Sequence, residues 1–185
     1  GVDYELSGDA YVTFGVAPET EARSAFDLPV PQTLRLEGRL TLGEGYTLRP
    51  LLGWAQWSIL DAQEAYNVAN GEALMRLERN FNDIYFGRAA LDMHLSSKVT
   101  LSTSLTYETG ATPTETFEPG LAESDNVELG IGAQFRLNDT LRLGISFSWQ
   151  QFMDVTVEQS AQEPAMNGHY TDQRQFLALD LGIEL

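Results

Sequence analysis

The sequence predicts an all-β protein, an antiparallel up-and-down transmembrane β-barrel with eight strands in this chain. Segments of ten or more residues alternate between apolar and polar side chains, which is the period of a β-strand. The connections between these segments alternate between short and long. The polar positions hold mostly Gly, Ser and Thr, and the 185 residues include one lysine, Lys98. The combination is typical of membrane barrels, whose strands alternate between lipid and a polar interior.

The clearest element is the segment NVELGIGAQFRLNDTLRLGISFSWQ, residues 126–150. Every second residue is apolar on both sides of the turn Asn138-Asp139-Thr140. Strict alternation on both sides of a short turn predicts a β-hairpin. The remaining segments of the same period are expected to be strands at 2–16, 33–42, 46–60, 81–95, 99–109 and 174–185.

The connections predict where the two ends of the sheet lie. Short turns are expected at 43–45, 96–98 and 138–140, and long acidic loops at 17–32, 61–80, 110–125 and 153–173. All long loops therefore fall at one end of an antiparallel meander, and both termini fall at the other. The one weak candidate for a helix is 63–78, inside the second long loop.

Charge and motifs limit the possible functions. The net charge of -16 argues against a nucleic-acid partner, because phosphate neutralisation needs clustered Lys and Arg. The absence of cysteine leaves no disulfide and no thiolate metal site. No nucleophile-elbow, zinc-protease or phosphate-cradling motif appears, so no catalytic residue, metal or cofactor is expected. His94 and Asp92 share a polar face, where a hydrogen-bonded pair is favoured over a catalytic one.

The alternation alone leaves open which face meets bulk solvent. A soluble barrel of the lipocalin kind buries the apolar face, and an outer-membrane barrel exposes it to lipid. Strand length, the asymmetry of the connections and the scarcity of lysine favour the second arrangement, and with it the bacterial outer membrane. The polar face would then form a lumen with a charged network. The expected members are Arg35, Glu37, Arg39, Arg88, Asp92, Glu128, Arg136, Arg142 and Asp180.

A small set of apolar residues is expected to face the lumen. Continuing the register of Arg49 along 46–60 turns Trp57 and Ile59 inward near the long-loop end. The same reasoning turns Ile84 and Phe86 inward on the next strand. These four residues are the candidate lining of a path for a hydrophobic ligand.

The chain resembles the FadL/TodX family of outer-membrane transporters for long-chain fatty acids and aromatic hydrocarbons. The likeness is carried by LPVPQTLRLEGRLTL (28–42), YTLRPLLGWAQWSILDA (46–62), RNFNDIYFGRAALDMHLSSKVTLSTSLTYETGATP (79–113) and the 126–150 hairpin. Trp57-Ser58 matches a strand-end pair that is common in the family. Asn82-Asp83 with Tyr85 resembles the start of its next hairpin, and GVDYELSGDA a strand midway along its fold.

The chain departs from the family pattern in two ways. The family fold has fourteen strands around an N-terminal hatch, and this chain corresponds to about the last eight strands. It is therefore expected to be the C-terminal part of a fourteen-stranded barrel, or else to close alone with eight strands. It also ends in Leu185, where such barrels usually end in an aromatic residue.

Three functions remain open from the sequence. The first is passive uptake of hydrophobic small molecules, with no cofactor and no enzymatic step. The second is a small outer-membrane barrel with a structural or adhesive role through its acidic extracellular loops. The third is a soluble ligand-binding barrel. For the membrane forms, the expected partners are membrane lipid, lipopolysaccharide and a hydrophobic ligand, together with either the missing N-terminal half of the barrel or other envelope proteins.

Overall fold

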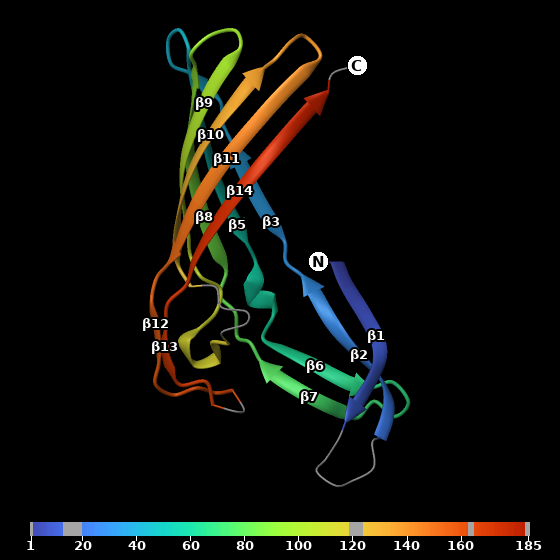
Figure 1. Cartoon of the computed structure of the whole chain (residues 1–185). Helices are drawn as coiled ribbons and strands as arrows, with labels where there is room; N and C mark the ends of the chain where they lie inside the picture. The colour runs from blue at the N-terminus through green and yellow to red at the C-terminus, as the bar shows by residue number, and fades with distance from the viewer. Residues whose placement is uncertain (1, 13–19, 119–123, 163–164, 184–185) are drawn as a thin grey trace.

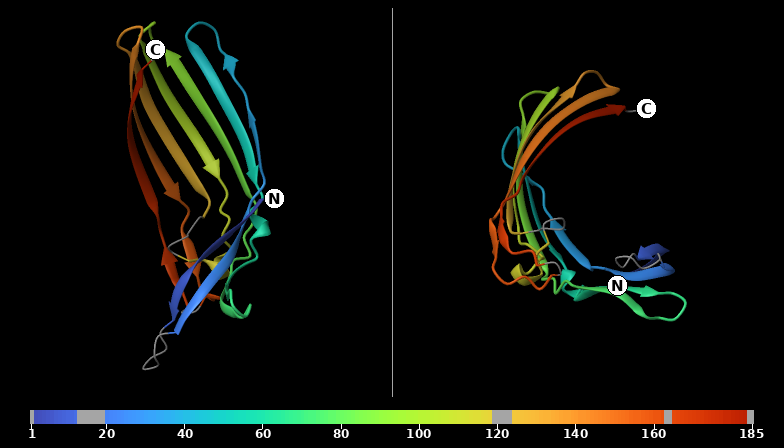
Figure 2. Two further views of the ribbon diagram at one scale, coloured as in Figure 1. Left: turned by 90° about the vertical axis from the view of Figure 1, so that its right-hand side faces the viewer. Right: turned by 60° about the horizontal axis from the view of Figure 1, so that its bottom comes forward.

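The computed structural model describes residues 2–12, 20–118, 124–162 and 165–183. Its main element is one antiparallel eight-stranded sheet, which curves into an open arc (Figures 1 and 2). In spatial order the strands are β14 (Gln173–Ile183), β11 (Leu141–Phe152), β10 (Asn126–Arg136), β9 (Val99–Glu108), β8 (Ile84–His94), β5 (Tyr46–Ala55) and β3 (Thr33–Glu37), with β4 (Leu40–Thr41) also paired to β5.

The arc is not closed. In the described part of the chain its two edges are β14 and β3, and each pairs with one neighbour in this sheet. The alternative of an eight-stranded barrel that closes alone is therefore not formed. The sheet has the shape of part of a larger barrel, because its curvature would require further strands to return β14 to β3 (Figure 2).

The register separates two faces along the whole sheet, because residues paired across neighbouring strands point to the same side. One row runs through Leu48, Leu91, Thr103, Ile131, Phe147 and Leu177. The next row, on the other face, runs through Thr47, Asp92, Ser102, Gly132, Ser146 and Ala178. The apolar row is open to the surroundings, with Leu177 71% and Ile131 63% exposed. The predicted alternation is confirmed.

Short turns hold one end of the sheet, at the top of Figure 1. Gly43 and Gly45 adopt positive φ angles of 66° and 90°, which side chains disfavour. In the next turn Ser96 accepts hydrogen bonds from the N–H groups of Lys98 and Val99, and in the third Asn138 accepts those of Thr140 and Leu141. Each turn supplies its own hydrogen-bond acceptors or glycines, as short hairpin connections require.

Residues 63–78 are not a helix. They form the hairpin of β6 (Ala62–Asn67) and β7 (Ala73–Glu78). The alanine, leucine and glutamate content favours a helix, but the Asn67-to-Glu72 turn reverses the chain, with Gly71 at φ 71° and Asn67 accepting the N–H of Ala69. Pairing of β6 with a neighbouring strand then overrides local propensity.

The predicted strand 2–16 is also placed differently. β1 (Val2–Val12) pairs with β2 (Thr20–Val30), all of which was expected to lie in the loop 17–32. Residues 13–16 fall outside the described residues. These strands form a separate sheet in the order β1-β2-β6-β7, at the long-loop end (Figure 1). β2 runs on into β3, so one extended segment links the two sheets.

Two predicted strands are shorter or broken. The segment 33–42 divides into β3 and β4 opposite Pro50, which has no N–H to donate to the ladder. Gly38 donates instead to the Pro50 carbonyl at 2.9 Å, and its missing Cβ leaves room for the proline ring. The segment 46–60 ends as a strand at Ala55, and the short 3₁₀ turn η1 (Trp57–Ile59) follows.

The remaining long connections contain short elements. The β9–β10 connection holds the 3₁₀ turn η2 (Thr114–Thr116), and the β11–β14 connection holds the hairpin of β12 (Val155–Val157) and β13 (Gly168–Tyr170). Within the described ranges, no helix combines the length and hydropathy needed to cross a bilayer.

Neighbouring positions on β9 test which face meets lipid. These 185 residues contain no cysteine, so a single replacement here is unambiguous once any cysteine elsewhere in the full-length protein is replaced by serine. We expect Ser104→Cys to react with a membrane-impermeant maleimide in the full-length protein in liposomes, because Ser104 lines the polar face. Leu105→Cys should stay unlabelled, because Leu105 lies on the apolar face, where it is 52% exposed. Reversed labelling would refute the assignment of the two faces.

Candidate functional site

An apolar cluster occupies the long-loop end of the polar face. Its buried centre is Ala55 at the end of β5, Ile84 at the start of β8 and Ala111 after β9. Trp57, Phe81 and Phe86 pack against this centre, with the Trp57 and Phe81 rings edge to face at 6.3 Å. Aromatic rings in this arrangement attract one another beyond the effect of burial. The cluster brings side chains from three connections together at one point.

Three of the four sequence-predicted lining residues lie in this cluster. Ile84 is 5% exposed, and Trp57 and Phe86 are partly buried against it. Ile59 lies in η1 and is not part of it. The strand register used to orient Trp57 and Ile59 ends at Ala55, so their positions follow from the 3₁₀ turn. Contact of these residues with a ligand stays a prediction.

Phe86 rests on a glycine. Gly53 of β5 is its partner in the register, and a Cβ on Gly53 would lie only 2.0 Å from the Phe86 ring. Any side chain at position 53 would therefore displace the Phe86 ring. The glycine allows the aromatic ring to lie against the sheet at the long-loop end of the polar face.

Asp83 ties η1 to the sheet. Its carboxylate accepts the Ser58 N–H at 3.1 Å and the Trp54 indole N–H at 2.9 Å. Hydrogen bonds from the Ser58 side chain, and then from its backbone, lower the pKa of Asp83 below the ordinary aspartate value. Asp83 therefore positions the turn that carries Trp57, which is a role the sequence pattern did not reveal.

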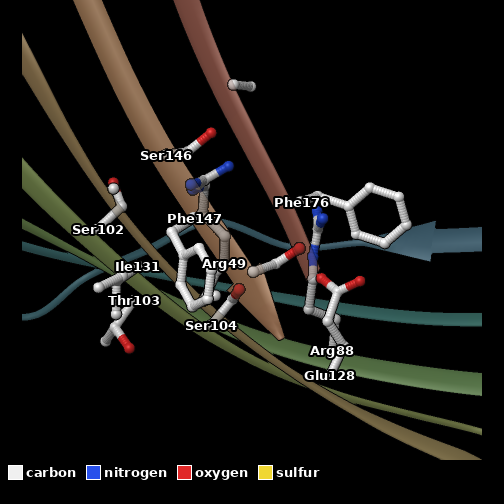
Figure 3. Close-up of a pocket in the computed structure, with 15 residues that line it drawn as sticks. Arg49, Arg88, Ser102, Thr103, Ser104, Glu128, Ile131, Ser146, Phe147 and Phe176 are labelled. Carbon is white, nitrogen blue, oxygen red and sulfur yellow. The ribbon is translucent and has the colours of Figure 1, made fainter. Parts of the chain in front are cut away.

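Next to the cluster along the same face, a pocket of about 280 Å³ lies against the sheet (Figure 3). Its wall is made mainly of small side chains, with Arg49, Arg88 and Glu128 as the charged groups and Phe147 and Phe176 as the aromatic residues. The small members are Ala90, Ser102, Ser104, Gly130, Gly132, Ser146, Ser148 and Ala178. A second hollow of about 290 Å³, which Arg39 also lines, shares Arg49 and Arg88 with it.

The best-defined polar contact in this wall is a bidentate ion pair. Arg49 donates from Nε to Asp92 at 2.7 Å and from Nη2 at 2.8 Å, and the Ser102 hydroxyl adds a third bond to Asp92 at 2.8 Å. Two parallel bonds fix the guanidinium plane as well as its charge. The sequence prediction placed Asp92 in the polar network but did not include Arg49. Arg49 could have been recognised as a member, because it is the one charged residue in the segment 46–60.

Arg88 differs from Arg49. Its Nε is buried and has no hydrogen-bond partner, although the side chain lines both hollows. In the register, Thr106 separates Arg88 from Glu128, and all three lie in one row. A buried donor without a partner costs free energy. A hydrogen-bond acceptor that enters the pocket and bonds to the Arg88 Nε would therefore gain binding energy.

The nine predicted network residues lie on the side of the sheet that was expected or, for Arg39, in the adjoining hollow. Among the described residues, one predicted ion pair forms between members, Arg35 with Glu37 at 3.3 Å, and both side chains are more than half exposed. Arg136 and Arg142 are direct register partners, where like charges repel. Their part in a closed lumen stays a prediction.

The expected His94–Asp92 hydrogen bond is wrong. His94 contacts the hydroxyl of Thr47 at 3.4 Å and that of Thr100 at 3.1 Å, while Asp92 is taken by Arg49 and Ser102. Residues two apart on a strand share a face but are about 7 Å apart along it. His94 and Asp92 therefore each bond to side chains of the neighbouring strands and not to one another. No cluster of three or more His, Cys, Asp or Glu with metal-binding geometry occurs in the parts of the chain that the structure describes.

The long connections are joined by a buried polar group, which we call the loop clamp: Arg79, Gln63, Thr116, Glu118 and Gln162. Arg79 is 4% exposed and donates to Glu118 at 2.6 Å and to Gln63 at 3.2 Å. The Thr116 hydroxyl donates to the Arg79 carbonyl, and Gln162 donates to the Thr116 carbonyl. Arg79 thus joins two connections that are far apart in sequence, and Gln162 attaches the third through the carbonyls of Glu78 and Thr116.

Acid should loosen η1 at a pH below the ordinary range for aspartate. Because the Asp83 pKa is lowered on folding, its contribution is present at neutral pH and is lost as the pH falls below about 4. We expect the fluorescence of Trp54 and Trp57, measured in a Trp149→Phe background, to change in that range. An Asp83→Asn variant should show no such transition, and a transition near neutral pH would contradict the assignment.

Loss of the clamp arginine should free the loops without unfolding the sheet. We expect Arg79→Ala to weaken their attachment by about 1.5–3 kcal/mol, the value of hydrogen bonds to charged groups. Limited proteolysis of the 110–118 segment should then accelerate, while the 153–162 segment keeps the bonds of Gln162 to the Glu78 and Thr116 carbonyls. Arg35→Ala is the matched control, since its exposed ion pair contributes less than about 1 kcal/mol. Equal cleavage in both variants would show that other contacts hold the loops.

Comparison with known proteins agrees with this architecture. The chain matches the family model for outer membrane protein transport proteins (OMPP1/FadL/TodX) over residues 1–184. No protein in the curated set of sequences matches it. A FadL homologue of Pseudomonas aeruginosa superposes with a TM-score of 0.71 at 16% identity, covering 87% of this chain and 36% of the other.

Two structures of TodX type show the same fold. The toluene transporter TodX of Pseudomonas putida gives a TM-score of 0.58 at 12% identity, over 96% of this chain and 39% of that one. A deltaS2 mutant of the TodX monoaromatic hydrocarbon channel gives 0.64 at 14% identity, over 96% and 41%. The chain thus spans about two fifths of the length of these structures. The predicted barrel fold and outer-membrane location are confirmed, and the chain belongs to the FadL/TodX family of outer-membrane transport proteins.

Proposed function

We propose that this chain forms part of a channel for the passive uptake of hydrophobic small molecules, such as long-chain fatty acids or aromatic hydrocarbons. The observation that carries the proposal is the order of surfaces along the polar face. The apolar cluster around Phe86 lies at the long-loop end, and the small-residue wall with Arg88 begins two residues further along β8. A ligand would leave water at the cluster and then pass along a wall that offers little steric hindrance.

The driving force would be the concentration gradient. Weak binding to the apolar cluster suits this role, because a site that releases its ligand must not hold it tightly. The channel would need no nucleotide, metal or other cofactor, and no bond is made or broken. The acidic loops would face the outside and contact lipopolysaccharide, and the apolar face would contact lipid.

The channel needs the rest of its wall. Hydrocarbon cannot satisfy the backbone groups of an open sheet edge, so the β3 and β14 edges require partner strands in the membrane. The chain covers about two fifths of the related structures, and we infer that further strands of the complete barrel pair with these edges. The lumen described here would be one side of the finished channel.

Two substitutions on β8 separate the roles of the apolar cluster and the arginine. In full-length protein expressed in a deletion strain, we expect Phe86→Ala to lower uptake of both oleate and toluene. Arg88→Gln should lower oleate uptake about tenfold or more, the value of a charge-assisted hydrogen bond to the carboxylate, and should leave toluene uptake unchanged. Leu105→Ala, on the apolar face, is the control for general damage.

Heat-modifiable gel migration must first show that each variant folds. Unchanged uptake of both compounds in the folded Phe86→Ala and Arg88→Gln variants would refute the transport path. It would favour the structural or adhesive alternative. Loss of toluene uptake in Arg88→Gln would show that the arginine has a structural role on the wall, with no selectivity for an anionic head group.

A further inference from the structure

The β9–β10 connection runs from the apolar cluster to the loop clamp. We call residues 110–118 of this connection the strap. Near its start, Ala111 is 2% exposed and belongs to the buried centre of the cluster, and its carbonyl accepts the Asn82 N–H at 2.7 Å. Further along, η2 lies beside the β12–β13 hairpin (Figure 1). One short segment therefore contacts both the residues where the transport path is proposed to begin and the neighbouring connection.

The far end of the strap is held by polar contacts. Glu118 accepts a hydrogen bond from the buried Arg79 at 2.6 Å, and the Thr116 hydroxyl donates to the Arg79 carbonyl at 2.7 Å. The Glu115 carbonyl accepts the Ala161 N–H at 2.7 Å. Because a hydrogen bond between charged groups is stronger than a neutral one, Arg79 is the main attachment of this end.

The middle of the strap carries an unfavourable group. Thr112 follows the buried Ala111, and its hydroxyl oxygen is buried without a hydrogen-bond partner in the described part of the chain. A buried hydroxyl without a partner raises the free energy of the position that buries it. Water would satisfy this hydroxyl if the strap moved away from the sheet. The observed position of the strap is therefore favoured by the clamp and disfavoured by Thr112.

We propose that the strap is a lid on the transport path, which the clamp holds against the apolar cluster and which the unpartnered Thr112 hydroxyl helps to open. The inference rests on the proposed function, because a lid matters only if ligands enter at the cluster. Opening withdraws Ala111 and uncovers Ala55 and Ile84, the other two residues of the buried centre. A hydrophobic ligand then takes the place of Ala111 and restores the lost apolar contact. Without a ligand, the strap keeps these residues out of water.

The first experiment measures opening without transport, by hydrogen–deuterium exchange of residues 110–118 in the full-length protein in detergent micelles. Thr112→Val removes the hydroxyl and keeps the shape of the side chain. Exchange should then slow about fivefold or more, the factor that corresponds to one unsatisfied buried hydroxyl. Thr112→Ser keeps the hydroxyl and should exchange like wild type, and Arg79→Ala should speed exchange. Unchanged exchange in Thr112→Val would overturn the proposal.

The second experiment measures toluene uptake by a deletion strain that expresses the same full-length variants, because a neutral solute should not depend on Arg88. Uptake should fall about fivefold or more in Thr112→Val and rise in Arg79→Ala, since the two changes shift opening in opposite directions. The double variant should lie between them. Thr140→Val, in the exposed turn 138–140, is the matched control and should leave exchange and uptake unchanged. Heat-modifiable migration shows that each variant is folded.

The outcomes separate the lid from the transport path itself. Changed exchange with unchanged uptake, while Phe86→Ala still lowers uptake, would overturn the lid and leave the path standing. Unchanged uptake in Phe86→Ala as well would mean that the proposed function has failed, and the lid with it. Lower uptake in both Thr112→Val and Arg79→Ala would show that the connection is needed in one fixed position, which also overturns the lid.

Discussion

The structure depends on one constraint: inside a bilayer, every backbone N–H and C=O must find a partner within the protein. Antiparallel pairing meets this need strand by strand, from β14 across to β3. A strand period of two then leaves one side for lipid and the other for the lumen. The polar wall and the apolar cluster both follow from which residues fall on which side.

The same constraint explains what could be predicted from the sequence. The alternation in β9, β10 and β11 fixed strand existence, pairing and face, because a slip of one residue would move every leucine to the lumen. The short turns could be recognised from their own glycines and hydrogen-bonding side chains. The inward positions of Ile84, Phe86, Arg88 and Asp92 followed from the same period.

The parts that could not be predicted depend on contacts between distant segments. The break at Gly38 is caused by Pro50 on the facing strand, and the β6–β7 hairpin is stabilised by pairing with β2. The ion pair between Arg49 and Asp92 was likewise not predicted, because it joins two different strands. The predicted orientation of Trp57 and Ile59 assumed that the strand continues to residue 60, but β5 ends at Ala55. A periodic pattern carries no information about where a distant partner interrupts it.

The two ends of the sheet differ in how they are held. Each short turn is stabilised by its own residues and needs no other connection. The long connections are joined to one another through buried side chains: Arg79 contacts Gln63 and Glu118 and accepts from Thr116, and Gln162 donates to the carbonyls of Glu78 and Thr116. Displacing any one of these three connections therefore breaks hydrogen bonds that also hold another, so this end of the sheet is mechanically coupled where the short-turn end is not.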